Sequence, residues 1–156
     1  MKPEIGKPAP DFTASAIGGE YTEETSLTLS ELKGNTVVLV FYPKDNTPGC
    51  TTQACDMRDD WSELSKMAKV FGVSIDPIKS HQKFIDKKSL PYPLIADEDK
   101  TIVEAYGVWV EKSMYGKKYM GTERSTFIVD PEGNLKAVLE KVSPKKHLGM
   151  LKEVLA

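Results

Sequence analysis

Cysteine and histidine are both scarce in this chain of 156 residues: there are two cysteines, Cys50 and Cys55, and two histidines, His81 and His147. Long apolar runs are missing too, since none approaches the roughly 18 residues of a membrane-spanning helix. The first residues lack the apolar core of a signal peptide. We therefore expect a cytoplasmic protein with no membrane partner. In that reducing compartment two cysteines are more typical of reactive thiols than of a structural disulfide.

An excess of charge of one sign is also absent. The net charge is −2, and acidic and basic residues are interspersed. This balance argues against a nucleic-acid partner. Hydrophobic residues make up 40% of the chain and charged residues 28%, as in an ordinary globular protein long enough to bury a sizeable core. We find no internal repeat or linker, so we predict a single domain over residues 1–156.

What the sequence does contain is one stretch, residues 41–55, that holds both cysteines. It follows a short run rich in β-branched and aromatic residues, TVVLVFY at 36–42, which predicts a buried strand. Pro48 and Gly49 then force a loop. Apolar residues at helical spacing predict a helix from near Cys50 to about residue 66. Cys50 should therefore lie in the first turn of a helix that follows a buried strand.

This position favours reactivity in Cys50. The first backbone N–H groups of a helix have no intrahelical partner, and the positive end of the helix dipole favours an anion. Both effects would increase the thiolate fraction of a cysteine placed there. Cys50 is thus a candidate nucleophile.

The spacing of the two cysteines is a second clue. On a regular helix, a step of five residues would place the Cα atoms of Cys50 and Cys55 roughly 8 to 9 Å apart on divergent faces. A disulfide needs Cα atoms within about 7 Å. Either the pair never bonds, or the first helical turns unwind to let it bond. Two separately buried thiols, or half of a metal site, remain as alternatives.

The rest of the chain predicts an α/β protein. The predicted elements are a hairpin at 13–25, a brief helix at 28–34, a strand at 68–75, a helix at 80–88, a short strand near a sheet edge at 90–96, a small helix at 99–106, a loop or flap at 111–123, a hairpin of strands at 124–130 and 135–140, and a helix at 144–155. The order βαβ, helix, β-hairpin, helix is that of a thioredoxin-like fold with an N-terminal β-hairpin extension, in which helices flank a central mixed sheet.

The cysteine stretch also resembles a known family. Pro43, Thr47 and Cys50 match the active-site signature PxxxTxxC of peroxiredoxins, and Cys55 matches the Q-type, or bacterioferritin-comigratory-protein, subgroup. The resemblance extends over nearly the whole chain, through residues 8–12, 72–74, 94–97 and 124–130. It implies a thiol-dependent peroxidase that reduces hydrogen peroxide and organic hydroperoxides. It also implies that thioredoxin, or a similar dithiol protein such as a glutaredoxin-like reductant, regenerates the enzyme.

The same resemblance assigns the two thiols. Cys50 would be the peroxidatic cysteine, which becomes a sulfenic acid, and Cys55 the resolving cysteine, which condenses with it to an intrachain disulfide. The low helix propensity of Thr51 and Thr52 would make the necessary unwinding less costly. An intrachain partner favours a monomer. No cofactor is expected.

Four neighbours of Cys50 would complete the site. The backbone N–H groups of Gly49 and Cys50 would bind the peroxide oxygens. The hydroxyl of Thr47 can accept and donate, and Pro43 would shield the pocket from water. Arg124 opens a strand predicted to lie beside the catalytic strand, and the resemblance makes it the cation of the site.

Two other functions are alternatives to the peroxidase. A protein thiol-disulfide oxidoreductase uses the same fold, although the chain lacks a CxxC motif. A redox-regulated chaperone would need an exposed apolar stripe, which the sequence does not show. A zinc site is disfavoured because the cysteine spacing is not two to four and the histidines do not cluster. We expect His81 and His147 to lie on solvent-exposed helix surfaces.

Overall fold

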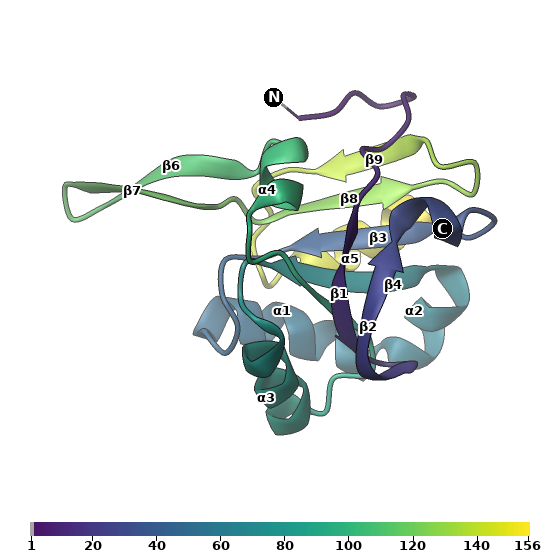
Figure 1. Cartoon of the computed structure of the whole chain (residues 1–156), viewed down its shortest axis with the longest axis horizontal. Coiled ribbons are helices and arrows are strands. Elements are labelled where there is room, and N and C mark those ends of the chain that lie inside the picture. The colour runs from purple at the N-terminus through teal and green to yellow at the C-terminus, as the bar shows by residue number, and fades with distance from the viewer. Residues whose placement is uncertain (1) are drawn as a thin grey trace.

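A computed structural model describes residues 2–156 (Figure 1). Its main sheet has seven strands in the order β2-β1-β5-β4-β3-β8-β9. These strands are β1 (Thr13–Gly18), β2 (Tyr21–Thr28), β3 (Val37–Phe41), β4 (Lys69–Ser74), β5 (Leu94–Ala96), β8 (Ser125–Val129) and β9 (Leu135–Leu139). β4 pairs in parallel with β3 and β5, whereas the remaining pairs are antiparallel. The predicted mixed sheet and its N-terminal hairpin are confirmed.

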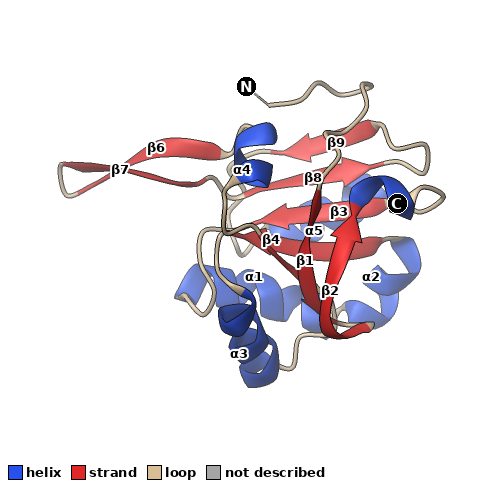
Figure 2. Ribbon diagram, viewed as in Figure 1, coloured by secondary structure: helices blue, strands red, loops and turns tan. Residues whose placement is uncertain are grey.

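Helices cover both faces of this sheet (Figure 2). They are η1 (Leu29–Leu32), α1 (Pro48–Asp59), α2 (Trp61–Met67), α3 (Ile78–Lys88), α4 (Thr101–Ala105) and α5 (His147–Leu155). Alternate residues of β3 enter two separate core clusters, one shared with α4 and η1 and the other with α1, α2, α3 and α5. Every β3 residue is buried, as expected for a strand covered on both faces.

Three of the predicted elements differ in kind or in place from the observed ones. The single helix predicted over 50–66 is wrong: α1 ends at Asp59 and α2 starts at Trp61. Asp60 breaks the helix, and its carbonyl accepts the N–H groups of Glu63 and Leu64 at the start of α2. Aspartate is a poor residue for a helix interior and a good one for a helix start.

The edge position predicted for the strand at 90–96 is wrong as well. β5 lies inside the sheet between β1 and β4. Its three residues follow the prolines, so neither proline occupies a ladder position within the strand. The carbonyl of Pro93 even accepts the N–H of Gly72 at 3.0 Å. Proline removes a donor but keeps its acceptor, which explains why this sequence is tolerated beside a central strand.

The segment at 111–123 was predicted as a loop, and this is also wrong. It forms most of a separate two-stranded hairpin of β6 (Trp109–Met114) and β7 (Lys117–Thr122) that projects from the body of the molecule (Figure 2). Polar residues occupy both faces, so the alternation that signals a strand is missing from the sequence. Tyr115 and Gly116, both at positive φ, form its tight turn.

Candidate active site

Cys50 is the third residue of α1, as predicted, and its side chain is buried. Thr47 is the N-cap and Pro48 the first helical residue, a position that suits proline because its missing N–H would be unpaired there. The N–H of Thr51 donates to the carbonyl of Thr47 at 2.8 Å. The N–H groups of Gly49 and Cys50 precede this first helical bond, so the helix itself gives them no acceptor.

Arg124 reaches this helix start from a distant part of the sequence. β8 pairs with β3 so that Ser125 lies opposite Phe41, which places Arg124 where the chain leaves β3 for the active-site loop. Its Nη2 lies 3.3 Å from the sulfur of Cys50. The guanidinium is permanently charged, so it stabilises negative charge on or near this sulfur. The predicted pairing of Cys50 with Arg124 is therefore present in the geometry.

Gln53 is a member of the site that the sequence reasoning missed. The second arm of the Arg124 guanidinium, Nη1, donates to Gln53 Oε1 at 2.6 Å. Gln53 is buried, and its Nε2 has no hydrogen-bond partner among the described residues. Because residues three apart share a helix face, the position of Gln53 relative to Cys50 was a usable signal. The fork of Arg124 thus spans the first turn of α1.

Gly49 gives Arg124 the space for this approach. A Cβ atom at Gly49 would lie 3.2 Å from Arg124 Nη2 and 3.3 Å from Pro144 Cγ. These distances are tighter than ordinary van der Waals contacts. The glycine next to Cys50 therefore allows a close fit between the helix start, the guanidinium and the segment before α5.

Thr47 and Pro43 lie on the loop between β3 and α1. The hydroxyl of Thr47 donates to the carbonyl of Lys44 at 2.9 Å, which leaves its lone pairs as acceptors. Asn46 adopts a left-handed conformation with φ of 61°, which asparagine tolerates better than most residues. Pro43 is half-buried at the end of the strand. Both predicted residues therefore belong to the loop that leads into the helix.

Cys55 is partly exposed on α1, and the two thiols are not bonded to each other. Both cysteines lie within the regular helix, five residues apart. The structure is therefore a dithiol state in which the helix keeps the two sulfurs on different faces.

Two hollows lie near Cys50, one lined by Cys50 itself and the other by Arg124. The one beneath Cys50 and Gln53 measures only ≈ 10 Å³, which is about the space of one water molecule. The other measures ≈ 460 Å³ and is lined by Arg124 together with Lys112, Lys141 and four neighbours. Burial and the nearby Arg124 charge lower the pKa of Lys112. A small reactant therefore has room on the Arg124 side and none beneath the helix.

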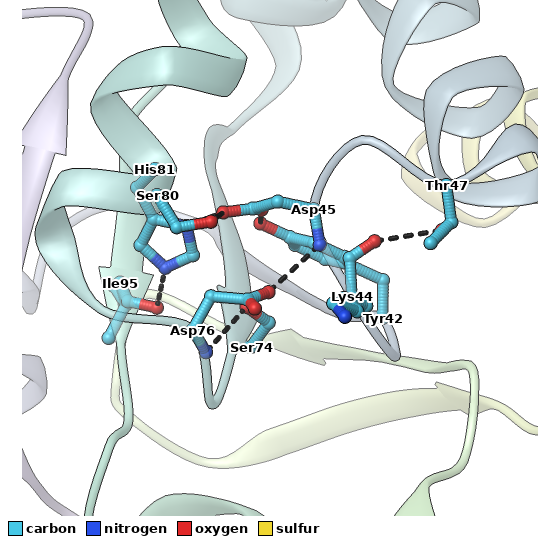
Figure 3. Close-up of polar contacts among 9 residues, drawn as sticks. All are labelled: Tyr42, Lys44, Asp45, Thr47, Ser74, Asp76, Ser80, His81 and Ile95. Atoms are coloured by element: carbon cyan, nitrogen blue, oxygen red, sulfur yellow. Dashed lines mark hydrogen bonds and ion pairs between the residues drawn. The ribbon is translucent and has the colours of Figure 1, made fainter.

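The prediction that both histidines are solvent-exposed is wrong. His147 is buried, and its Nε2 lies 2.8 Å from the hydroxyl of Thr126. Burial and, secondarily, the charge of Arg124 lower its pKa to about 4, so the ring is neutral at pH 7. His81 is buried in a polar network beneath the active-site loop, with Asp45 and Ser80 as neighbours (Figure 3).

The only close group of metal-ligand side chains among residues 2–156 is Asp45, Asp76 and His81, whose ligand atoms lie within 4.8 Å of one another. Neither cysteine belongs to it. His81 Nδ1 and Asp45 Oδ2 are 2.7 Å apart, a direct hydrogen bond rather than a pair of ligands around an ion. The same part of the chain contains no helix with the length and apolar character of a membrane span.

Comparisons with known proteins show the family to which this chain belongs. The sequence model of the AhpC/TSA family matches residues 5–138. Peroxiredoxin Bcp of Bacillus subtilis is 45% identical over 149 residues, which cover 95% of this chain and 92% of the relative. A solved structure of Xanthomonas campestris peroxiredoxin Q superposes with a TM-score of 0.86 at 37% identity, covering 97% of this chain and 96% of that one.

A second solved structure bears on the chemistry. It comes from work on the alkyl peroxide reduction activity of the bacterioferritin comigratory protein of Xanthomonas campestris, and it is 36% identical with a TM-score of 0.86, covering 97% of each chain. The predicted thioredoxin-like class is confirmed by these neighbours. The chain therefore belongs to the AhpC/TSA family, as a peroxiredoxin of the Bcp or Q type, and it is a thiol-dependent peroxidase.

Proposed function

We propose that Cys50 is the peroxidatic cysteine of this enzyme and that Cys55 resolves it within the same chain. The observation that carries the proposal is the 3.3 Å contact between Arg124 Nη2 and the buried sulfur of Cys50 at a helix N-terminus. A buried sulfur beside a fixed cation and unpaired N–H groups is suited to react as a thiolate. An inert buried cysteine would need none of these neighbours.

The first chemical step is a displacement on oxygen. The Cys50 thiolate attacks one oxygen of the hydroperoxide, an S–O bond forms, and the O–O bond breaks. The departing oxygen leaves as hydroxide or alkoxide and takes a proton, so the products are a sulfenic acid and water or an alcohol. Negative charge moves from sulfur to the leaving oxygen, so the site must stabilise that charge at both positions.

Each neighbour of Cys50 has a role in this step. Arg124 would stabilise the thiolate and then the leaving oxygen, while the N–H groups of Gly49 and Cys50 would donate to the peroxide oxygens. Thr47, whose own proton goes to the Lys44 carbonyl, would accept the proton of a protonated peroxide oxygen and so orient it. Pro43 would limit the access of water at the end of β3.

The second step requires a change of shape. Cys55 must attack the sulfenic sulfur of Cys50 and expel water, which forms the disulfide. Five residues of regular helix keep the two side chains on divergent faces, so the first turns of α1 must unwind. A dithiol protein, thioredoxin or a glutaredoxin-like reductant, would then reduce the disulfide and let the helix re-form.

The remaining assignments follow from this scheme. We infer hydrogen peroxide and organic hydroperoxides as substrates, in line with the alkyl peroxide reduction named for the Xanthomonas campestris relative. An intrachain disulfide needs no second subunit, so a monomer suffices, and a thiol reductant suits the cytoplasm. Residues 1–156 act as one domain, because a single sheet connects both core clusters.

The test is intact mass and free-thiol count after fully reduced protein meets one equivalent of hydrogen peroxide. The wild type should lose two hydrogens without forming a covalent dimer. Cys55→Ser should oxidise at the wild-type rate, accumulate a trappable sulfenic acid, and fail to turn over with a dithiol reductant. Normal steady-state turnover in Cys55→Ser would contradict the role of Cys55. Oxidation of the wild type at the rate of an ordinary free thiol would contradict the role of Cys50.

A further inference from the structure

Asp45, in the loop between β3 and α1, is the centre of a buried polar network that the reaction itself does not use (Figure 3). Its side chain is 4% exposed. Oδ1 accepts from the Tyr42 hydroxyl at 2.5 Å, and Oδ2 accepts from the Ser80 hydroxyl at 2.8 Å. His81 Nδ1 lies 2.7 Å from the same Oδ2. Tyr42, directly after β3, and two residues of α3 thus meet at one carboxylate of the loop.

The two ring nitrogens of His81 both face acceptors. Nδ1 faces the Asp45 carboxylate, and Nε2 lies 2.9 Å from the carbonyl of Ile95 in β5. A neutral imidazole carries one N–H and can serve only one of these acceptors, whereas an imidazolium serves both. The Asp45 carboxylate accepts from Tyr42 and Ser80 as well, which suits its ionised form. The hydrogen-bond inventory therefore assigns a proton to each nitrogen of His81.

The charges around His81 support the same state. Asp76, two residues after β4, accepts the backbone N–H of Asp45 at 2.8 Å and the hydroxyl of Ser74 at 2.7 Å. The ligand atoms of Asp45, Asp76 and His81 lie within 4.8 Å of one another. Burial and the adjacent Asp45 raise the pKa of Tyr42, so that its phenol stays a neutral donor. Asp45 is buried and Asp76 half-buried, and two carboxylates this close to each other favour a neighbouring cation. His81 is the basic side chain in this group.

The network is linked to the reacting cysteine through four residues of chain. Asp45 follows Lys44, whose carbonyl accepts the hydroxyl of Thr47. The carbonyl of Thr47 in turn accepts the N–H of Thr51 and closes the first turn of α1 around Cys50. A displacement of Asp45 would therefore shift Thr47 and the helix start relative to Arg124, which is held separately on β8.

We propose that His81, as an imidazolium paired with Asp45, is a positioning residue of the peroxidase site. It ties the loop at 43–47 to α3 and β5, so that Thr47 and the first turn of α1 are presented to Arg124 in one fixed geometry. When the helix unwinds to form the disulfide, this tie keeps the loop in place and limits the unwinding to residues after it. The proposal rests on the proposed role of Cys50.

The first test is ¹⁵N NMR of the histidine side chains in the reduced wild type at pH 7. His81 should show the shifts of a doubly protonated ring, and Asp45→Asn should convert it to a neutral ring. His147 provides an internal reference in the same sample, because its lowered pKa predicts a neutral ring. A neutral His81 in the wild type would overturn the proposal, whatever the activity of any variant.

The second test is a double-mutant cycle on the rate of Cys50 oxidation by hydrogen peroxide in a single turnover. Asp45→Asn and His81→Asn should each slow oxidation about tenfold or more, as expected for a small misplacement of reacting groups. Because both act through one contact, the double variant should be no slower than the slower single variant. Lys83→Ala, at an exposed position on α3, is the matched control and should oxidise at the wild-type rate.

Additive losses, or wild-type oxidation in a folded His81→Asn variant, would overturn the proposal. If His81→Asn does not fold, Asp45→Asn and the NMR measurement still decide it. Slow oxidation of the wild type itself would instead refute the assignment of Cys50, while the NMR result would continue to test the His81–Asp45 pair by itself.

Discussion

The two halves of the active-site segment are held in different ways. Asp45 ties the loop at 43–47 to Tyr42 after β3, to Asp76 after β4, and to Ser80 and His81 on α3. The first turns of α1 are held by helical hydrogen bonds, by core packing, and by the fork of Arg124 on Cys50 and Gln53. The loop is thus bonded to distant parts of the chain, whereas the side-chain bonds that reach Cys50 and Gln53 come from Arg124. The second half is therefore the part that can unwind.

Loss of the Arg124 guanidinium should have the largest effect on the rate of Cys50 oxidation. Arg124→Gln keeps a polar side chain but deletes the charge beside Cys50. We expect the rate of Cys50 oxidation by hydrogen peroxide to fall about 10² to 10³-fold, the usual cost of losing one donor that stabilises a developing oxyanion. Stopped-flow oxidation of the reduced protein measures it. Arg58→Gln is the matched loss of an arginine, because Arg58 bonds Asp59 and the carbonyl of Lys88 and not Cys50. Its oxidation rate should stay within a few-fold of wild type. An equal fall in the oxidation rate of both variants would contradict the role of Arg124.

Protonation of the buried His147 should lower the free energy of unfolding in acid. Its pKa is about 4 in the folded protein and near 6.5 when unfolded, so its contribution to stability is complete above pH 6.5 and is lost as the pH falls towards 4. Between pH 7.5 and pH 4.5 this amounts to about 2 to 3 kcal/mol in the free energy of unfolding. Urea unfolding at both pH values should show that His147→Gln loses correspondingly less stability than the wild type. Equal acid losses in the two proteins would refute the assignment.

Hydrogen exchange can measure the loop and the helix start separately. The N–H of Asp45 donates to Asp76 Oδ2, and the N–H of Thr51 donates to the carbonyl of Thr47. On formation of the Cys50–Cys55 disulfide, we expect the protection of Thr51 to fall at least about tenfold, because its helical bond opens. The protection of Asp45 should stay the same. If both amides lose protection together, the loop and the helix unwind as one unit.

The smallest change in the oxidation rate is expected from a substitution at Gly49. In Gly49→Ala the new Cβ would press on Arg124 Nη2 and on Pro144, so the guanidinium must shift by a few tenths of an ångström. We expect oxidation of Cys50 to slow by a few-fold. Alanine also favours the helix over glycine by up to about 1 kcal/mol, so disulfide formation should slow too. Gly149→Ala, at a helical glycine with open space around it, is the control for the change in helix propensity. Faster oxidation in Gly49→Ala would contradict the role of this close contact.

Local sequence was enough for the elements that bear the reactive thiols. The β-branched run at 36–42 gave a buried strand because both faces of β3 are covered, and Pro48 with Gly49 placed Cys50 in the first turn of a helix. The five-residue spacing alone required unwinding before a disulfide could form, since helix geometry is independent of the fold around it. The hairpin of β8 and β9 was equally local, because its turn residues lie between two apolar runs.

What surrounds the thiols was decided by tertiary structure. Arg124 and Gln53 meet only because β8 pairs with β3 in one register. The burial of His81 and His147 depends on partners far away in the sequence, although His81 does lie three and four residues before Phe84 and Ile85, on the inner face of α3. Periodicity reports which face of a helix is inward. Whether a polar side chain on that face finds a carboxylate, a carbonyl or an arginine beside it depends on how distant elements pack, and that sets its charge.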